Sequence, residues 1–264
     1  METGLTGLIT LTTDFGLRDP FVGIMKGIIL SINPEVRVVD LTHQVESFDV
    51  MDGALALVQS YPYFPPGAIH VVVVDPGVGS ARRPILVATP TYRFVGPDNG
   101  VFSLVYEREA SFEVRDITVE RYFRKPVSQT FHGRDIFAPV AAWLSKGLAP
   151  EALGSLITDY VCVAVAKPER VSPNLTRGEV LRVDKFGNLI TNLTAGHLQH
   201  EGSFRILINQ IRVTQLVSSY AEGRGNGVIA IVGSAGLVEI AAYQASAAER
   251  LGAGKGTEII LETQ

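Results

Sequence analysis

The sequence predicts an α/β protein: an N-terminal three-layer α/β domain with a mostly parallel sheet, followed by a smaller C-terminal all-β, barrel-like domain. Residues 71–74 are four consecutive valines, and such a run is typical of a strand buried on both faces of a parallel sheet. Strand and helix patterns alternate up to about residue 150, as they do in βαβ units. From Arg177 onward the chain shows short strands, turn residues and no long helix, which indicates a small barrel or sandwich.

The elements of the first domain follow from local patterns. Runs of β-branched and apolar residues predict strands at 8–13, 36–41, 68–74, 84–89, 93–95 and 112–114. Apolar residues at helical spacing predict helices at 20–31, 48–61 and 136–146. Asp19 is expected to cap the first of these helices, with Pro20 at its first position. Asp135 is expected to cap the last helix, and Gly147 to follow its C-terminal end.

The boundary between the two domains is expected at residues 167–176, KPERVSPNLT, because this segment has two prolines and few apolar residues. The predicted α/β domain is therefore 1–166, the linker 167–176 and the barrel-like domain 177–264.

Composition restricts the class of protein. The net charge of −4 and the pI of about 5.8 lack the basic footprint of a nucleic-acid-binding protein. Cys162 is the single cysteine and lies in an apolar run, so we interpret it as a buried apolar residue rather than a nucleophile. The first residues lack the basic region of a signal peptide, and no apolar run reaches the roughly 18 residues of a membrane span. We expect a soluble cytoplasmic protein.

Polar residues gather in four segments of the first domain. Asp14 and Asp75 follow predicted strands, at the edge of an α/β sheet where ligands bind. Asp14 can accept two hydrogen bonds from a ribose diol, or can simply stabilise a turn. Arg82 and Arg83 follow Asp75, and His132 precedes a glycine near a predicted helix start. The fourth segment, Asp98–Asn99, is compatible with plain turn residues.

These side chains do not predict a metal site. Asp14, Asp75, Asp98 and His132 include metal-binding residue types, but the sequence contains no HxH, HxxxH or HxD pair. We expect no metal and no cofactor.

Two turns of the second domain carry candidate binding residues. In Asp184–Asn188, Asn188 matches an adenine edge, Phe186 offers a stacking face and Asp184 can receive a cationic amine. The alternative is an ordinary hairpin loop with Gly187 at positive φ. In the turn 233–236, Ser234 and backbone N–H groups can hold a carboxylate.

In combination, the motifs TDFG, DPGVG with an arginine seven residues after the aspartate, GPDNG, TFHGRD, DKFGN and GSAG resemble the S-adenosyl-L-methionine (SAM) hydroxide adenosyltransferase family. These enzymes hydrolyse SAM to adenosine and L-methionine and are related to fluorinases and chlorinases. The resemblance spans residues 13–259.

The resemblance implies a homotrimer that binds SAM between the N-terminal domain of one subunit and the C-terminal domain of its neighbour. It implies the following site residues: Asp75, Arg82 and His132 for catalysis, Asp14 for ribose, Asp184 for the methionine amine, Phe186 and Asn188 for adenine, and Ser234 for the methionine carboxylate. Arg83 is adjacent to Arg82 and is an alternative to it. Related halogenases have Tyr-Pro where this chain has Asp75–Pro76, so water is expected as the nucleophile rather than halide. A halide-using transferase and a non-catalytic SAM- or adenosine-binding module are the alternatives.

Overall fold

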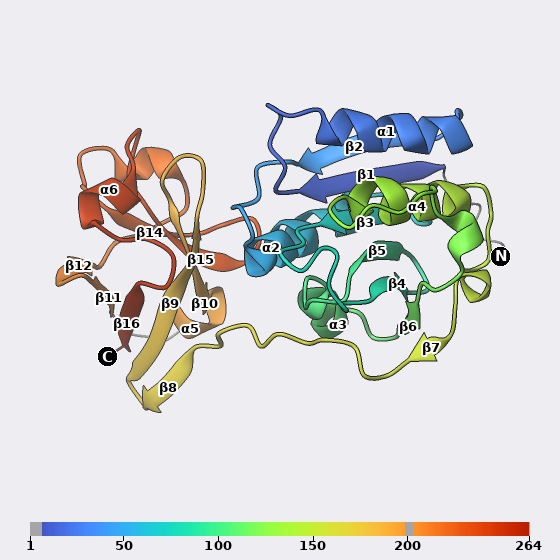
Figure 1. Ribbon diagram of the computed structural model, residues 1–264. Helices are drawn as coiled ribbons and strands as arrows, with labels where there is room; N and C mark the ends of the chain where they lie inside the picture. The colour runs from blue at the N-terminus through green and yellow to red at the C-terminus, as the bar shows by residue number, and fades with distance from the viewer. Residues whose placement is uncertain (1–6, 199–202, 264) are drawn as a thin grey trace. The chain divides into compact units, whose positions relative to one another are not determined.

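The computed structural model describes residues 7–198 and 203–263 (Figure 1). The chain forms two compact units, Met1–Val165 and Ala166–Gln264. The fold class expected from the sequence, an α/β domain followed by a smaller all-β domain, is confirmed.

Unit 1 contains a seven-stranded sheet with the order β2-β1-β3-β5-β4-β6-β7. The strands are β1 (Leu8–Thr13), β2 (Arg37–Thr42), β3 (Ile69–Val73), β4 (Pro84–Ala88), β5 (Arg93–Pro97), β6 (Glu113–Asp116) and β7 (Leu156–Ile157). The pairings among β2, β1, β3 and β5 are parallel, and those from β5 through β4 and β6 to β7 are antiparallel. The sheet is therefore parallel over only half of its width.

Helices cover both faces of this sheet. The helices are α1 (Phe21–Ile32), α2 (Val50–Ser60), α3 (Ser103–Arg108) and α4 (Ala138–Ser145), with a π-helical turn at Gly133–Phe137 and short 3₁₀ turns at Tyr61–Tyr63, Glu120–Tyr122 and Pro150–Ala152. Val71 and Val73 of β3 pack into the core with α1 and α4. Val72, between them, packs into the opposite core with α2 and α3. The valine run is continuous because alternate residues enter two different cores.

Three local expectations were wrong. Helix α1 begins at Phe21 with Pro20 at the N-cap position and no side-chain capping bond, so Asp19 does not cap it. Asp135 lies inside the π-helical turn and caps no helix. Cys162 is exposed, because the segment that leaves unit 1 runs along its surface.

Unit 2 is a curled, nine-stranded sheet with the path β12-β11-β16-β9-β10-β15-β14-β13, to which β8 adds beside β9. Its strands are β8 (Glu169–Ser172), β9 (Leu175–Val183), β10 (Leu189–Thr194), β11 (Phe204–Ile208), β12 (Ile211–Val213), β13 (Leu216–Val217), β14 (Ile229–Val232), β15 (Leu237–Ala241) and β16 (Glu258–Thr263). Short helices α5 (Ala195–Leu198) and α6 (Ala247–Leu251) and a 3₁₀ turn (Tyr220–Gly223) complete it. Ile206 of β11 and Ala230 of β14, far apart along the path, share one core, which requires the sheet to curl. Residues 167–176, expected to be a linker, contain β8 and the start of β9.

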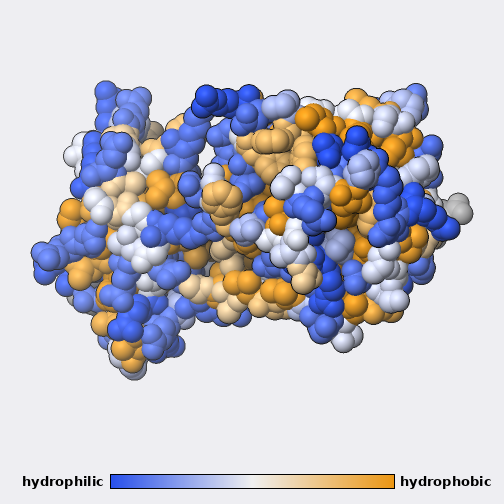
Figure 2. Space-filling view, viewed as in Figure 1, coloured by the Kyte–Doolittle hydropathy of each residue, from blue (hydrophilic) through white to orange (hydrophobic). Residues whose placement is uncertain are grey.

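The visible surface mixes apolar and charged residues (Figure 2). Exposed apolar side chains include Leu17 before α1 and Ile24 and Leu30 on α1. Among the residues that the structure describes, no helix has the length and apolar character needed to cross a bilayer.

Candidate active site

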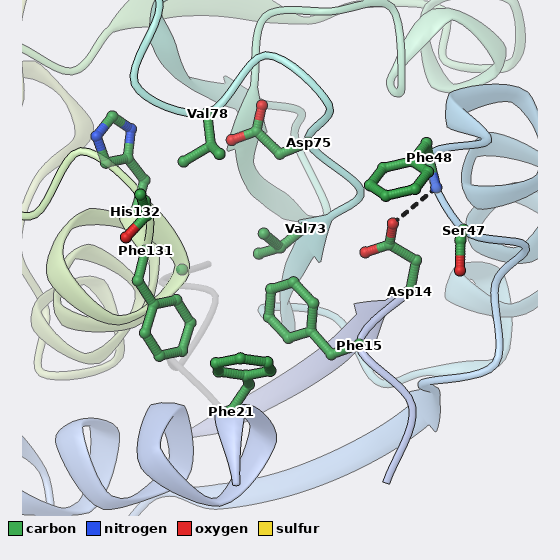
Figure 3. A pocket seen from close by; sticks show the side chains of 12 residues that line it. Asp14, Phe15, Phe21, Ser47, Phe48, Val73, Asp75, Val78, Phe131 and His132 are labelled. Carbon is green, nitrogen blue, oxygen red and sulfur yellow. Dashed lines mark hydrogen bonds between the residues drawn. The ribbon is translucent and has the colours of Figure 1, made fainter. Parts of the chain in front are cut away.

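A cavity of about 290 Å³ lies at the carboxyl ends of β1 and β3 in unit 1 (Figure 3). Four loops and the start of α1 enclose it with Asp14, Phe15, Phe21, Ser47, Phe48, Val73, Asp75, Val78, Thr130, Phe131, His132 and Gly133. Parallel strands β1 and β3 are neighbours, so the residues that follow them, Asp14 and Asp75, reach the same edge of the sheet. Asp75, His132 and Asp14, expected as site residues, therefore line one cavity.

Asp75, Arg82 and His132 form one hydrogen-bonded group. Arg82 Nε donates to both oxygens of Asp75, at 2.9 and 3.1 Å, and Arg82 Nη2 also donates to Asp75 Oδ2. The same Nη2 lies 2.8 Å from His132 Nδ1. The side chains of Asp75 and Arg82 are only 5% and 8% exposed. A two-pronged arginine bond to a carboxylate fixes both groups in orientation, so the fold presents Asp75 to the cavity as a rigid anion.

The arginine also sets the state of the histidine. A guanidinium has only donors, so His132 Nδ1 accepts from Arg82 and the neutral ring carries its proton on Nε2. Burial lowers the pKa of His132, and the positive charge of Arg82 lowers it further. A hydrogen bond with the Ser128 backbone acts in the opposite direction on this pKa. His132 is therefore a neutral ring whose donor N–H is at Nε2.

Arg83, the alternative to Arg82, binds other partners. Its Nε and Nη2 lie 3.0 and 2.7 Å from Asp98 Oδ2, and its Nη1 lies 2.8 Å from Asp159 Oδ1. The geometry therefore brings Arg82 to Asp75 and directs Arg83 to the segment that leaves unit 1.

Asp135 organises the loop that carries His132. It is fully buried and accepts from Arg134 at 2.7 and 2.8 Å, from the Ser128 N–H at 2.8 Å and from Arg124 at 3.2 Å. Burial alone would raise the pKa of Asp135, but the bonds from Arg134 and Ser128 outweigh burial and lower it. A buried carboxylate held by four donors stays ionised and rigid, so Asp135 stabilises the loop rather than capping a helix.

The loops of Asp75 and His132 are in direct contact. Gly79 has φ of +77°, and a Cβ there would lie 2.2 Å from the backbone oxygen of Gln129. Only glycine permits this conformation and this approach together.

Asp14 joins the loops after β1 and β2. Its Oδ2 accepts from the Phe48 N–H at 2.9 Å (Figure 3). Phe48 has φ of +66°, which is unusual for an aromatic residue, and its side chain is 73% exposed on the rim. The same loop is anchored by buried His43, whose Nδ1 lies 2.9 Å from Thr13 Oγ1 and whose Nε2 lies 3.0 Å from Asp40 Oδ1.

Sequence reasoning missed the apolar lining of the cavity. Phe15, Phe21 and Phe131 meet edge to face, with ring centroids 5.3 to 5.9 Å apart. Phe15 and Phe131 are neighbours of Asp14 and His132 in the motifs, which was an available signal. Nothing in the pattern of residues around Phe48 indicates that its ring reaches the rim.

A second cavity, of about 660 Å³, lies in unit 2 and is lined by Asp184, Phe186, Asn188, Tyr220, Ala242, Gln244, Ala245 and Ser246. Asp184 accepts from the N–H groups of Phe186 and Asn188 and from Asn188 Nδ2, all at 2.8 Å. The carboxylate therefore holds the hairpin in shape and fixes Asn188, while the exposed ring of Phe186 remains open to a ligand. The sequence did not point to Tyr220, Gln244 or Ser246.

Ser234 is the expected site residue of unit 2 that lies apart from Asp184, Phe186 and Asn188 in the second cavity. It is exposed in the turn between β14 and β15 and does not line the second cavity. Tyr220 connects the second cavity to the strand that follows the Ser234 turn, because it lines the cavity and its hydroxyl donates at 2.7 Å to Glu239 of β15. A Cβ on Gly233, in that turn, would lie 1.9 Å from Glu239 Oε1.

Within the described residues, no group of three or more histidine, cysteine, aspartate or glutamate side chains is arranged to hold a metal ion.

Comparisons with known proteins cover nearly the whole chain. Residues 9–154 match the SAM hydroxide adenosyltransferase N-terminal domain, and residues 178–260 match the C-terminal domain of the same name. Proteins named (R)-S-adenosyl-L-methionine hydrolase are similar to this chain. The one from Methanocaldococcus jannaschii is 36% identical, and the match covers 95% of this chain and 94% of that protein. The one from Thermus thermophilus is 37% identical, and the match covers 94% of this chain and 97% of that protein. A fluorinase from Actinoplanes sp. is more distant, at 27% identity over 74% of each chain. The crystal structure of an uncharacterised conserved protein from Thermotoga maritima superposes with a TM-score of 0.89 at 35% identity, covering 96% of this chain and 99% of that one.

Proposed function

Since this chain belongs to the SAM hydroxide adenosyltransferase family, we propose that it hydrolyses S-adenosyl-L-methionine to adenosine and L-methionine. The curated relatives are named as hydrolases of the (R) epimer, so the substrate that we assign is SAM with the (R) configuration at sulfur. The observation that carries the proposal is Asp75, a rigid carboxylate held by Arg82 on the wall of a cavity.

The chemistry needs a positioned water more than it needs an acid. The sulfonium of SAM leaves as the neutral thioether of methionine, so the leaving group requires no proton and no metal. Water must lie in line with the C5′–S bond, about 3 Å from C5′. We assign Asp75 the role of accepting a hydrogen bond from this water and receiving its proton as the C5′–O bond forms.

The hydrogen-bond pattern supports Asp75 over His132 as the proton acceptor. His132 Nδ1 accepts from Arg82, so Nε2 carries a proton and has no lone pair for water. His132 is then a donor that orients the water oxygen, and Arg82 stabilises the developing hydroxide character and holds Asp75. The carboxylate also repels halide, because a second anion beside Asp75 is unfavourable in a partly dry site.

The substrate-binding roles are proposals as well. Asp14, with Oδ2 bonded to Phe48, is assigned to the ribose hydroxyls. In unit 2, Asn188 and Phe186 are assigned to adenine, Asp184 to the methionine ammonium and Ser234 to its carboxylate.

We propose that the protein is a cytoplasmic homotrimer in which each site takes its N-terminal half from one subunit and its C-terminal half from a neighbour. The exposed apolar side chains Ile24 and Leu30 of α1 are compatible with contact between copies.

The test is to incubate purified protein with each SAM epimer in ¹⁸O-labelled water, with a chelator present. We expect adenosine from the (R) epimer, with the label in its 5′-hydroxyl, because water attacks C5′. Asp75→Asn should keep SAM binding and lose most turnover. Absence of adenosine, or its appearance only when a divalent ion is restored, would show that the proposal is wrong.

The fluorinase relative makes a halide-using transferase the second candidate. Adding chloride to the same assay distinguishes the two, because a transferase would form 5′-chloro-5′-deoxyadenosine. Tight binding of SAM without any product would instead identify a binding module.

A further inference from the structure

The motif Gly96–Gly100 spans the end of β5 and the turn after it. The proposed function leaves it unexplained, because its polar side chains line neither cavity. Asp98 Oδ1 accepts from the Val161 N–H at 2.8 Å, and Asp98 Oδ2 binds Arg83. Asp98 therefore fastens the segment that leaves unit 1 and has no contact with the catalytic group.

Asn99 has a different partner. Its Nδ2 donates to the backbone oxygen of Val74 at 2.9 Å, and its Oδ1 accepts from the Val101 N–H at 3.2 Å. The amide therefore connects its own turn, after β5, to the residue that immediately precedes Asp75.

Val74 lies just beyond the last residue of β3 that pairs with a neighbouring strand. The pairing of β3 with β5 ends at Val71, and its pairing with β1 ends at Val73. Val74 is fully buried, and a buried carbonyl needs a hydrogen-bond partner. Asn99 supplies that partner one residue before the catalytic aspartate.

Gly96, in β5 just before this turn, makes the contact possible. A Cβ on Gly96 would lie 2.5 Å from the backbone oxygen of Val72. Because glycine has no Cβ, β5 approaches β3 closely at this point, and the following turn is delivered beside Val74.

We propose, on the basis of the function proposed above, that Asn99 is a positioning residue for Asp75. Its side-chain amide fixes the orientation of the peptide group between Val74 and Asp75. That orientation directs the carboxylate to the two donors of Arg82 and to the attacking water. Displacement of a reacting group by about 1 Å can reduce the rate 100-fold.

The experiment compares Asn99→Ala and Asn99→Asp with the wild type. The concentration of SAM-binding sites is titrated first, and kcat is expressed per binding-competent site. A smaller fraction of folded protein then does not lower the measured kcat. We expect kcat per site to fall about 10- to 100-fold in both variants, with the Kd for SAM changed by less than about twofold. The Asp variant should be at least as impaired, because it places a carboxylate oxygen opposite the Val74 oxygen.

Ser103→Ala is the matched control. Ser103 is buried in the same region, accepts from the Val163 N–H at 2.8 Å and donates to Gly100 at 2.7 Å. It stabilises the fold without touching Val74, so this variant should lower Tm and keep kcat per site.

Normal kcat per site in both Asn99 variants would overturn the inference while leaving the proposed function intact. An equal fall in Ser103→Ala would do the same, because the effect would then be a general loss of packing. A wild-type protein that forms no adenosine would overturn both proposals.

Discussion

At the scale of single residues, neighbouring arginines in the chain have separate partners. The side chain of Arg82 is 8% exposed and contacts Asp75 and His132, whereas that of Arg83 is 27% exposed and contacts Asp98 and Asp159. The two arginines lie in the loop immediately before β4, and their different partners separate the group around Asp75 from a structural contact.

This separation gives the first prediction. Arg82→Lys should reduce kcat about 100-fold or more, because an ammonium cannot bridge both oxygens of Asp75 and Nδ1 of His132 together. Arg83→Lys should leave kcat within about threefold and lower stability by roughly 1 kcal/mol, since its ion pairs are partly exposed. Steady-state kinetics and thermal unfolding of both variants check this. Equal losses of kcat in the two variants would contradict the assignment.

His70 gives a prediction about pH. It is fully buried among aromatic rings, with Nδ1 2.8 Å from Thr10 Oγ1, and burial lowers its pKa from 6.5 to about 3. The unfolded chain binds this proton below pH 6.5 and the folded chain does not, so stability is complete above pH 6.5 and falls as pH drops toward 3.

The expected loss from this group between pH 7 and pH 5 is about 2 kcal/mol. Trp143, the single tryptophan, lies in α4 of unit 1 and reports the unfolding of that unit by fluorescence. His70→Phe should have a smaller difference in unfolding free energy between the two pH values than the wild type. An unchanged difference would show that His70 is not the responsible group.

At the scale of elements, the site depends on contacts between loops rather than on the loops separately. The segment after β3 carries Asp75, and the segment before the π-helical turn carries His132. They touch at Gly79 and Gln129. Any side chain at Gly79 therefore disturbs both of these loops.

Gly79→Ala should accordingly lower kcat at least 10-fold and destabilise unit 1, because the new Cβ meets a carbonyl oxygen and the residue has positive φ. Gly225→Ala is the matched control: Gly225 has φ of +82° and open space around its Cβ position. The control should be destabilised by the positive φ alone and should keep the kcat of the wild type. Similar kcat values for the two variants would show that the contact between the loops is dispensable.

The elements also show what the sequence could predict. Strand positions followed from the valine run and similar local patterns. The family resemblance carried by the motifs indicated Asp75, Arg82 and His132, and the structure brings these three side chains together. Long-range contacts were not accessible. Asp135 resembles a helix cap locally. In the structure its carboxylate instead accepts hydrogen bonds from Arg124 and Ser128, which lie several residues earlier in the chain. Residues 167–176 have a linker's composition, yet edge strand β8 forms because β9 offers unpaired backbone groups.

At the scale of the whole molecule, each unit carries half of the residues that we assign to the SAM site. Unit 1 holds Asp75, Arg82, His132 and Asp14, and unit 2 holds Asp184, Phe186, Asn188 and Ser234. If each site combines unit 1 of one subunit with unit 2 of another, as we propose, two defective chains can repair each other.

Complementation tests this directly. Asp75→Asn damages the unit 1 half of a site and Asn188→Ala the unit 2 half, so each homotrimer should be inactive. A cyclic trimer repeats one head-to-tail contact between unlike surfaces, so the two halves of each site come from different chains. With equal co-expression and random assembly, each half is intact in about half of the sites, and both halves are intact in about a quarter. We therefore expect about a quarter of wild-type activity, in a species of three chains by light scattering. A site confined to one chain yields no recovery, since every chain then carries a defect.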